Sequence, residues 1–285
     1  MKITLLGTGL MGAPMARHLA AAHKVTVWNR SRARAEGLAD VATIAETPAA
    51  ACAGAEVVIA MLLDGPATRA VLSAEAMQAA APGALIIDMG SVDPETDRAL
   101  AVQARGLGLR YLDAPVSGGV AGAKAASLAI LVGGTAADFA AAEPVLRLLG
   151  RPTLLGAVGA GQVAKLANQL IVATTIGAVA EALRLAQAAG CDPAALREAL
   201  RGGFADSRIL DLHGKRMVEG DFTPGGRSVV QLKDLDNAMA LAQGCGLDLP
   251  LAQTVTAAFR DFVTHHDGGE KDHAAYYEWL KLRLN

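Results

Sequence analysis

Short, continuous apolar segments alternate with alanine-rich stretches over the first 156 residues. The apolar segments lie at residues 2–6, 25–28, 57–62, 84–88, 111–113 and 128–132. Apolar runs without in–out alternation are typical of strands that are covered on both faces. Strands that alternate with helical segments predict an α/β fold built on a doubly wound, parallel sheet.

The pattern changes beyond Gly161. Residues 162–189 contain no proline and one glycine, Gly177, and their apolar positions surround the predicted helix. A helix that is apolar on all sides is buried, so we expect this one to lie between domains or subunits. Further helices are predicted over residues 193–200, 228–243, 251–265 and 272–284. We therefore predict an α/β domain over residues 1–160 and an all-α C-terminal domain over residues 161–285.

The first predicted strand runs directly into a glycine-rich turn and then into a helical segment over residues 13–22. The turn has the G-x-G-x-x-G spacing. Its first glycine permits a tight turn, the second lets a pyrophosphate approach the backbone, and the third lets helix and strand pack closely. The helix N-terminus adds N–H donors and a partial positive charge. This context predicts a Rossmann-type dinucleotide site that contains Gly7, Thr8, Gly9, Leu10, Met11 and Gly12.

The end of the second strand bears on which dinucleotide is bound. NAD sites usually place Asp or Glu about 20 residues beyond the glycines, where the carboxylate binds the ribose 2′-hydroxyl. In this chain Asn29, Arg30 and Ser31 occupy that segment. A guanidinium binds a 2′-phosphate that a carboxylate would repel, so we predict NADP(H) in preference to NAD(H). The alternative is that Arg30 is a solvated loop residue and Asn29 a helix cap.

Composition narrows the classes of protein that remain. The 285 residues suit one large or two ordinary domains, and a hydrophobic content of 52% supplies a sizeable core. The net charge is −2 without a basic stripe, so nucleic-acid binding has no support. Cys52, Cys191 and Cys245 are odd in number and far apart, which favours reduced thiols in the cytoplasm. No uninterrupted apolar run reaches about 18 residues and no signal-peptide pattern precedes the first strand, so we expect neither a membrane span nor secretion.

Two segments carry candidate polar chemistry. In residues 113–119, the Ser117 hydroxyl and the N–H groups of Gly118 and Gly119 offer a nest for a small carboxylate, although an ordinary glycine turn has the same composition. In the long helix, Lys165 shares a face with Asn168 and Gln169 because the spacings are three and four.

A charged side chain is costly in an apolar helix, so we expect Lys165 to face a cleft. Desolvation lowers the pKa of a lysine and makes it a usable acid/base, whereas the alternative is a snorkelling lysine near a helix start. Lys233 and Asp234 place a second charged pair on a later helix, which by itself is typical of a solvated helix face.

Taken together, these motifs resemble the β-hydroxyacid dehydrogenase family, which includes 3-hydroxyisobutyrate dehydrogenase and tartronate semialdehyde reductase. The resemblance covers nearly the whole chain and rests on residues 7–16, 113–119, 159–165 and 233–235 in that order. It implies an N-terminal Rossmann domain, a long interdomain helix, an all-α C-terminal domain, and an active site in the cleft between the domains.

The resemblance also implies roles for individual residues. Lys165 would be the catalytic acid/base, and Ser117 with its two glycines would bind the substrate carboxylate. Lys233 would lie near both nicotinamide and substrate. Leu62, Leu63 and Ser91 match positions that line the cofactor, and Asn168 matches an active-site amide.

The chain departs from the family pattern at several positions. In many members the amide lies four residues after the lysine, where this chain has Gln169, so Asn168 and Gln169 both remain candidates. Gly90 stands where serine is frequent and Gly226 where an aromatic residue is frequent, which leaves the pocket wall undefined. His18 replaces a common asparagine and is interpreted as structural.

The predicted activity is a reversible hydride transfer between NADPH and a short oxo acid or semialdehyde, whose reduced form is a β-hydroxyacid or 2-hydroxy acid. Lys165 would donate a proton to the developing alkoxide. No metal is expected, because no cluster of His, Cys and Asp is visible along the chain.

Alternatives remain for the activity, the substrate and the assembly. An imine reductase of the same fold is the alternative enzyme, although such enzymes generally lack the lysine, and a non-catalytic dinucleotide sensor or scaffold is a further alternative. Residues 120–123 resemble hydroxyisobutyrate enzymes, whereas residues 201–205 resemble tartronate semialdehyde reductases. The family implies a homodimer or a homotetramer.

Overall fold

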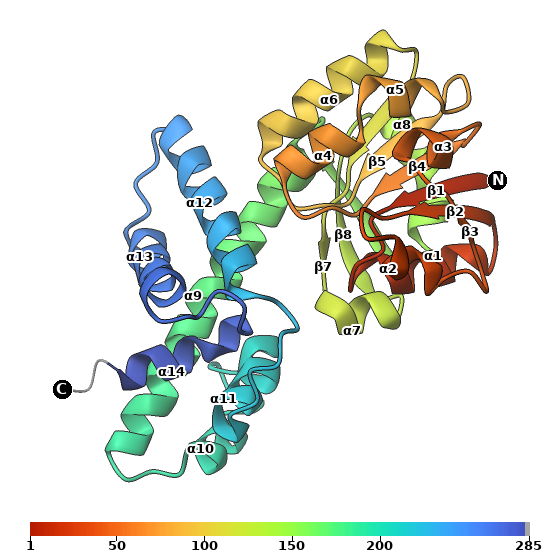
Figure 1. The fold of residues 1–285 in the computed structure, drawn as a ribbon. Coiled ribbons are helices and arrows are strands. Elements are labelled where there is room, and N and C mark those ends of the chain that lie inside the picture. Colours follow the sequence, from red (N-terminus) through yellow and green to blue (C-terminus); the bar gives the residue numbers. More distant parts are fainter. Residues whose placement is uncertain (283–285) are drawn as a thin grey trace. The chain divides into compact units, whose positions relative to one another are not determined.

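A single sheet organises the N-terminal half of the chain in the computed structural model, which describes residues 1–282 (Figure 1). Its parallel part has the order β3-β2-β1-β4-β5-β6, which is the doubly wound order of dinucleotide-binding folds. These strands are β1 (Lys2–Leu6), β2 (Lys24–Trp28), β3 (Thr43–Ile44), β4 (Val57–Ala60), β5 (Leu85–Asp88) and β6 (Arg110–Asp113). Beyond β6, strand β8 (Leu128–Gly133) is antiparallel to β6 and β7 (Val116–Ser117) and parallel to β9 (Gly150–Gly156).

The apolar runs predicted six of these strands correctly: β1, β2, β4, β5, β6 and β8. Strands β3 and β7 are 2 residues long and therefore too short to produce a run. Strand β9 contains Arg151 and Pro152, so it lacks a continuous apolar segment as well.

Both faces of the sheet are buried, as the continuous apolar runs predicted. Val57 and Ile59 belong to a core cluster packed under α1 (Gly12–Ala20) and α8 (Ala136–Leu146). Val58 and Ala60 belong to a second cluster with α3 (Pro48–Cys52), α5 (Ala74–Gln78) and α6 (Pro94–Gly106). Burying one such aliphatic side chain fully is worth about 1.5–3 kcal/mol, so the buried strand residues on both faces help to hold the helical layers.

The remaining helices of this half are short. They are α2 (Arg32–Glu36), α4 (Gly65–Val71) and α7 (Gly119–Lys124). Two of the helices that follow strands begin at a capping aspartate. The carboxylate of Asp64 accepts the Ala67 N–H at 2.9 Å, and that of Asp93 accepts the Thr96 N–H at 2.8 Å. Such caps satisfy N–H groups that have no partner within the helix, and they fix the loops after β4 and β5.

The second half is helical, as predicted. It comprises α9 (Ala160–Ala188), α10 (Pro193–Ala199), a π-helical turn (Leu210–Gly214), α11 (Lys215–Glu219), α12 (Ser228–Gly244), α13 (Pro250–His265), a 3₁₀ turn (His273–Ala275) and α14 (Tyr276–Lys281). Its core joins α9 and α12 to the aromatic side chains of Phe259, Tyr276 and Trp279. The rings of Phe259 and Tyr276 stack with centroids 4.9 Å apart. The helix predicted over residues 272–284 is thus a 3₁₀ turn followed by α14, and its last positions lie outside the described residues.

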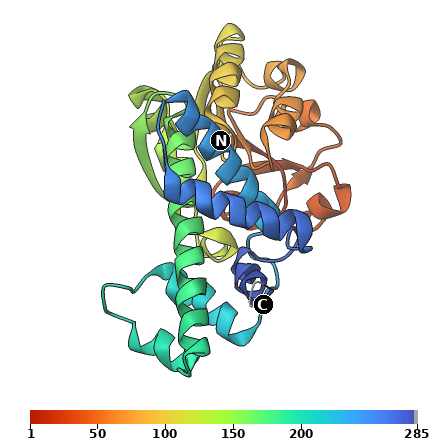
Figure 2. The same cartoon turned by 90° about the vertical axis from the view of Figure 1, so that its left-hand side faces the viewer.

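The chain divides into two compact units, Met1–Lys165 and Leu166–Asn285. The sequence placed the domain boundary near residue 160, where α9 begins, whereas this division falls inside α9 after Lys165. Figure 2 shows α9, in green, as one continuous helix.

By length and composition, α9 is apolar enough to cross a membrane, and 33% of its most apolar window is buried. The sequence expectation counted uninterrupted apolar runs and therefore missed this property, because polar residues such as Lys165 interrupt the helix. A core helix of a soluble protein has the same composition, so the property does not identify a membrane span. Ile171 and Leu185 on this helix are 69% and 73% exposed, so apolar surface remains uncovered by the described residues.

Candidate active site

The glycine-rich turn lies at the carboxyl end of β1, beside the end of β4. Strand order reverses between these neighbours, and ligands of doubly wound sheets bind at that point. Gly7 has φ +102°, and a Cβ on it would lie 2.4 Å from the carbonyl oxygen of Met61. A Cβ on Gly12, the first residue of α1, would lie 1.9 Å from the carbonyl oxygen of Gly7. The turn therefore brings bare backbone and a helix N-terminus to one place, which fits a pyrophosphate.

Asn29 links this turn to the end of β2. Its Oδ1 accepts the Thr8 N–H at 3.0 Å, and its Nδ2 donates to the Ser31 carbonyl at 3.0 Å. The amide thus holds two loops of the predicted cofactor site together. Leu10 of the turn is 66% exposed.

The arginines after β2 differ in their environments. Arg32 forms ion pairs with Glu36 and Glu46, which neutralise its charge locally. Arg30 has no ion pair within residues 1–282. Arg34 reaches back to the glycine turn, with its Nη1 4.0 Å from where a Cβ on Gly9 would lie. The sequence analysis named Arg30 and assigned no role to Arg34, which lies four residues later within α2.

The loops after β4 and β5 carry the other predicted cofactor residues, Leu62, Leu63 and Ser91. They are packed so closely that a Cβ on Gly90 would lie 2.9 Å from the Leu62 carbonyl oxygen. The Gly90 N–H also donates to Asp88 Oδ1 at 2.9 Å. The glycine that replaces a frequent serine at this position is therefore explained by a lack of space between the two loops.

Ser117 ends β7, and the two glycines after it take backbone conformations that favour glycine. Gly118 has φ +140° and Gly119 has φ +60°, and Gly119 begins α7. Both backbone conformations are ones that glycine adopts easily, and the carboxylate nest at these residues stays a prediction. His18 of α1, interpreted from the sequence as structural, lies with Nε2 3.0 Å from the Lys124 carbonyl oxygen at the end of α7.

Asp113, at the end of β6, holds the start of α9. Its Oδ1 accepts the Gly159 N–H at 2.8 Å, and its Oδ2 accepts the Gln162 N–H at 2.9 Å. A Cβ on Gly161 would lie 2.3 Å from the Leu131 carbonyl oxygen, so glycine is needed for this close approach. Half-buried Lys165 follows about one turn later in the helix. The predicted acid/base therefore lies near the same edge of the sheet as the glycine turn.

Asp113 belongs to a cluster of buried carboxyl groups. Asp88 and Asp113 are paired in register on β5 and β6, and the Tyr111 hydroxyl donates to Asp97 Oδ1 at 2.6 Å. Burial, and then the neighbouring carboxylate of Asp88, raises the pKa of Asp97 well above its usual range. Burial also raises the pKa of Asp113, although backbone N–H groups of α9 oppose that rise. In the sequence, Asp88 and Asp113 each end an apolar run. The sequence analysis assigned no role to these two carboxylates as a cluster.

The helical unit brings together the other predicted residues, Asn168, Gln169 and Lys233. Gln169 Nε2 donates to Asp234 Oδ2 at 2.7 Å, and Gln169 Oε1 accepts Asn168 Nδ2 at 2.9 Å. Lys233 Nζ lies 3.0 Å from Asp234 Oδ1. By itself the sequence was typical of a solvated helix face, but the side chain of Asp234 is buried, 1% exposed, and that of Lys233 is half-buried, 24% exposed.

Gln231 completes this network. Its Nε2 donates to the Gln169 carbonyl at 3.2 Å, and His273 Nδ1 lies 3.3 Å from its Oε1. The ring of His273 also lies against Gly226, where a Cβ would be 3.2 Å from Cε1. That ring occupies the space beside the position where an aromatic residue is frequent in the family.

His273 is also part of a titratable cluster with His213 and Asp272, whose ligand atoms lie within 4.8 Å of one another. The sequence analysis missed this cluster, because His213 lies far along the chain from the adjacent Asp272 and His273. Burial raises the pKa of Asp272, but hydrogen bonding to His213, the charge of His273 and backbone N–H groups outweigh it and lower the pKa below its usual range. Arg216 lies 3.1 Å from Asp272, so we interpret the cluster as an ion-pair network.

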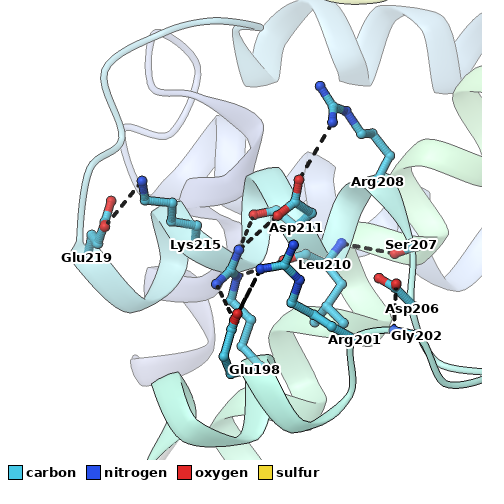
Figure 3. Close-up of polar contacts among 11 residues, drawn as sticks. Glu198, Arg201, Gly202, Asp206, Ser207, Arg208, Leu210, Asp211, Lys215 and Glu219 are labelled. Atoms are coloured by element: carbon cyan, nitrogen blue, oxygen red, sulfur yellow. Dashed lines mark hydrogen bonds and ion pairs between the residues drawn. The ribbon is translucent and has the colours of Figure 1, made fainter.

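Residues 201–205, which resemble tartronate semialdehyde reductases, form an exposed turn after α10. Figure 3 shows Arg201 paired with Glu198, at 2.7 Å, and the Gly202 N–H bound to Asp206. Phe204 is fully exposed. The charges of this segment are thus balanced locally and are not gathered around a substrate-sized site.

Known proteins match the chain over its whole length. A family model described as the NAD binding domain of 6-phosphogluconate dehydrogenase matches residues 2–161, and one described as NAD-binding of NADP-dependent 3-hydroxyisobutyrate dehydrogenase matches residues 159–280. The 2-hydroxy-3-oxopropionate reductase of Escherichia coli (strain K12) is 40% identical over 289 residues, covering 100% of this chain and 99% of the relative. The 3-hydroxyisobutyrate dehydrogenase of Pseudomonas aeruginosa is 36% identical, covering 95% of this chain and 94% of the relative.

Solved structures agree with these matches. The 3-hydroxyisobutyrate dehydrogenase of Mycobacterium tuberculosis with L-serine has a TM-score of 0.89 and 32% identity, covering 98% of this chain and 99% of that one. An imine reductase from Myxococcus stipitatus has a TM-score of 0.65 and 22% identity, covering 98% and 99%, which shows the fold alone. The sequence, the doubly wound sheet and these matches together establish that the chain belongs to the β-hydroxyacid dehydrogenase family, NAD(P)-dependent oxidoreductases that interconvert hydroxyacids and their semialdehydes or oxo acids.

Proposed function

We propose that this protein reduces tartronate semialdehyde, or an oxo acid of similar size, with NADPH. The main observation behind this proposal concerns one edge of the sheet in the first unit. The glycine turn, the Ser91 loop and the capped start of α9 with Lys165 all lie at that edge. This arrangement suits a cofactor beside a proton donor. The substrate class follows from the Escherichia coli 2-hydroxy-3-oxopropionate reductase, which is 40% identical over the full length.

The preference for NADPH over NADH rests on two cationic side chains after β2. Arg30 directly follows Asn29 at the end of β2, and Arg34 Nη1 is 4.0 Å from where a Cβ on Gly9 would lie. Within residues 1–282 neither forms an ion pair, whereas Arg32 pairs with Glu36 and Glu46. A charge-assisted hydrogen bond to a phosphate contributes about 1.5–3 kcal/mol, or roughly tenfold to a hundredfold in affinity.

In the proposed mechanism, the nicotinamide supplies the hydride for reduction when it is bound. Lys165 holds the proton that the carbonyl oxygen takes up as it becomes an alkoxide, and in oxidation the neutral amine accepts the hydroxyl proton. The Ser117 hydroxyl and the N–H groups of Gly118 and Gly119 bind the substrate carboxylate. For Lys233, on α12 of the helical unit, the family resemblance implies a place near nicotinamide and substrate.

Asn168 is the better candidate for the substrate-binding amide. The side chain of Gln169 already donates to Asp234 and Gln231 and accepts from Asn168. Its amide is therefore committed to holding α9 against α12. The Asn168 amide is oriented by its hydrogen bond to Gln169, and it lies three residues after Lys165 on the same helix face.

We also infer that the protein is a homo-oligomer. Ile171 and Leu185 leave apolar surface on α9 that the described residues do not cover, and such surface is typical of subunit interfaces. Sedimentation velocity tests this directly. A monomer at micromolar concentration would reject the inference.

The proposed function is tested by kcat/KM with NADPH and with NADH for tartronate semialdehyde, succinic semialdehyde, glyoxylate and a cyclic imine. We expect tartronate semialdehyde with NADPH to give the highest value. Arg34→Ala should reduce the preference for NADPH by about tenfold, whereas the matched control Arg32→Ala, which removes an arginine that is already ion-paired, should leave it unchanged. Turnover of the imine alone would favour the imine reductase alternative, and equal use of NADH would reject the cofactor assignment.

A further inference from the structure

Gln162 is a fully buried polar side chain near the start of α9. Its Nε2 donates to the Gly90 carbonyl at 2.9 Å, and its Oε1 accepts the Val92 N–H at 3.1 Å. A backbone carbonyl only accepts and a backbone N–H only donates, so these partners fix the orientation of the amide. A buried amide is costly unless it is satisfied in this way, so the side chain acts as a defined bridge.

The two partners of Gln162 flank Ser91. The loop that carries this predicted cofactor residue is therefore held from both sides by one side chain. On the helix, Lys165 lies three residues after Gln162, which is close to one turn of 3.6 residues. A single amide thus connects the loop of a cofactor residue to the turn of α9 that carries the proposed proton donor.

The backbone of Gln162 adds a second anchor. Its N–H donates to Asp113 Oδ2 at 2.9 Å, while the Gly159 N–H donates to Asp113 Oδ1 at 2.8 Å. The first turn of α9 is thereby attached to the end of β6 and to the loop after β5. All of these groups belong to the compact Met1–Lys165 unit, so the arrangement lies within one part of the chain.

The surroundings of Gln162 require a neutral group. Asp88 on β5, Asp97 on α6 and Asp113 on β6 are all fully buried in the same region, with the hydroxyl of Tyr111 bound to Asp97. A carboxylate at position 162 would be a further negative charge in a region of low dielectric, and it would face the Gly90 carbonyl without a proton to donate.

We propose that Gln162 is a positioning residue for hydride transfer: by bridging Gly90 and Val92, it sets the distance between the cofactor loop at Ser91 and Lys165. This inference rests on the role of Lys165 given under the proposed function. A misplacement of about 1 Å between reacting groups lowers the rate by roughly a hundredfold, so a flexible bridge would act mainly on kcat.

The test compares Gln162→Leu, Gln162→Glu and wild type, with Gln78→Leu as a matched control at an exposed glutamine of α5. The measurements are kcat and KM for tartronate semialdehyde from pH 5.5 to 9, and the Kd of NADPH. We expect Gln162→Leu to lower kcat by about tenfold to a hundredfold with a KM within threefold of wild type. Gln78→Leu should match wild type.

Gln162→Glu provides a readout that a purely structural role would not change. A protonated carboxyl group donates to the Gly90 carbonyl and accepts from the Val92 N–H, whereas a carboxylate does not donate. The ratio of its kcat to that of wild type should therefore approach one at low pH and fall as pH rises, while the ratio for Gln162→Leu stays flat. If Gln162→Leu does not fold, the pH dependence of Gln162→Glu relative to wild type still tests the positioning role.

The proposal is overturned if folded Gln162→Leu has a kcat within threefold of wild type, or if the ratio for Gln162→Glu is as low at pH 5.5 as the ratio for Gln162→Leu. Lys165→Ala is measured alongside. Full turnover by Lys165→Ala would reject the acid/base role. The pH-dependent kcat ratio of Gln162→Glu reports on the loop at Ser91 independently of the role of Lys165.

Discussion

Replacing Gly12 by alanine tests the packing of the glycine turn. A Cβ at this position would lie 1.9 Å from the Gly7 carbonyl oxygen and 3.3 Å from Leu5 Cδ2. Because Cβ atoms essentially never approach other atoms within 3.0 Å, α1 and the turn must separate by about 1 Å. That movement shifts the N–H groups at the helix N-terminus away from the place where the pyrophosphate binds.

The cost of Gly12→Ala follows from this overlap. Overpacking of this kind destabilises by about 1–3 kcal/mol. If the cofactor-bound state bears the whole cost, the Kd of NADPH rises by about fivefold to 150-fold. If folding bears part of it, Tm falls by about 2–4 °C for each kcal/mol. The assays are a fluorescence titration with NADPH and a thermal melt.

Gly106→Ala is the matched control for this substitution. Gly106 is the last residue of α6, and a Cβ there would meet nothing within 4 Å. It should leave NADPH binding unchanged and stabilise the protein by up to about 1 kcal/mol, because alanine is the better helix former. A Gly12→Ala protein that keeps both its NADPH affinity, within twofold, and its Tm, within 2 °C, would refute the packing argument.

Three further substitutions test the polar networks. The pKa of Asp97 is raised in the folded protein, first by burial, so its contribution to stability is fully present below about pH 4 and is lost as pH rises through the raised pKa. Asp97→Asn keeps an acceptor for Tyr111 and cannot ionise, so its Tm relative to wild type should increase between pH 5 and 9; a difference that does not vary with pH would contradict this. In the helical unit, Gln169→Leu removes three side-chain hydrogen bonds and should lower stability by about 2–3 kcal/mol, whereas Asn168→Leu should lower kcat/KM by about tenfold with a smaller loss of stability. Thermal melts and steady-state kinetics of the two variants would show the opposite order if Gln169 were the substrate-binding amide.

Much of the fold was predictable because it depends on local pattern. Each long buried strand leaves a continuous apolar run, and the G-x-G-x-x-G spacing identifies the turn after β1 whatever the rest of the chain does. The features that were missed have weak local signals. Strand β9 contains Arg151 and Pro152, and it forms because β8 is available as a partner.

The site was only partly predictable, for a related reason. Lys165, Asn168 and Gln169 are neighbours on one helix, so their spacing alone places them on a common face. The partners that hold them come from distant parts of the chain: Asp113 caps α9, and Gln231 binds Gln169. No local pattern encodes these contacts, because the tertiary packing of strands and helices brings the residues together.

The most direct test of the account is the rate of hydride transfer in a single turnover of Lys165→Ala. Enzyme saturated with NADPH is mixed with tartronate semialdehyde, and the loss of absorbance at 340 nm is followed. We predict that the rate falls by about a hundredfold or more, because proton donation to the developing alkoxide is lost, while the Kd of NADPH stays within twofold of wild type. Lys215→Ala, at an exposed lysine of α11, serves as the control. A transfer rate for Lys165→Ala within threefold of wild type would contradict the proposal that this lysine supplies the proton.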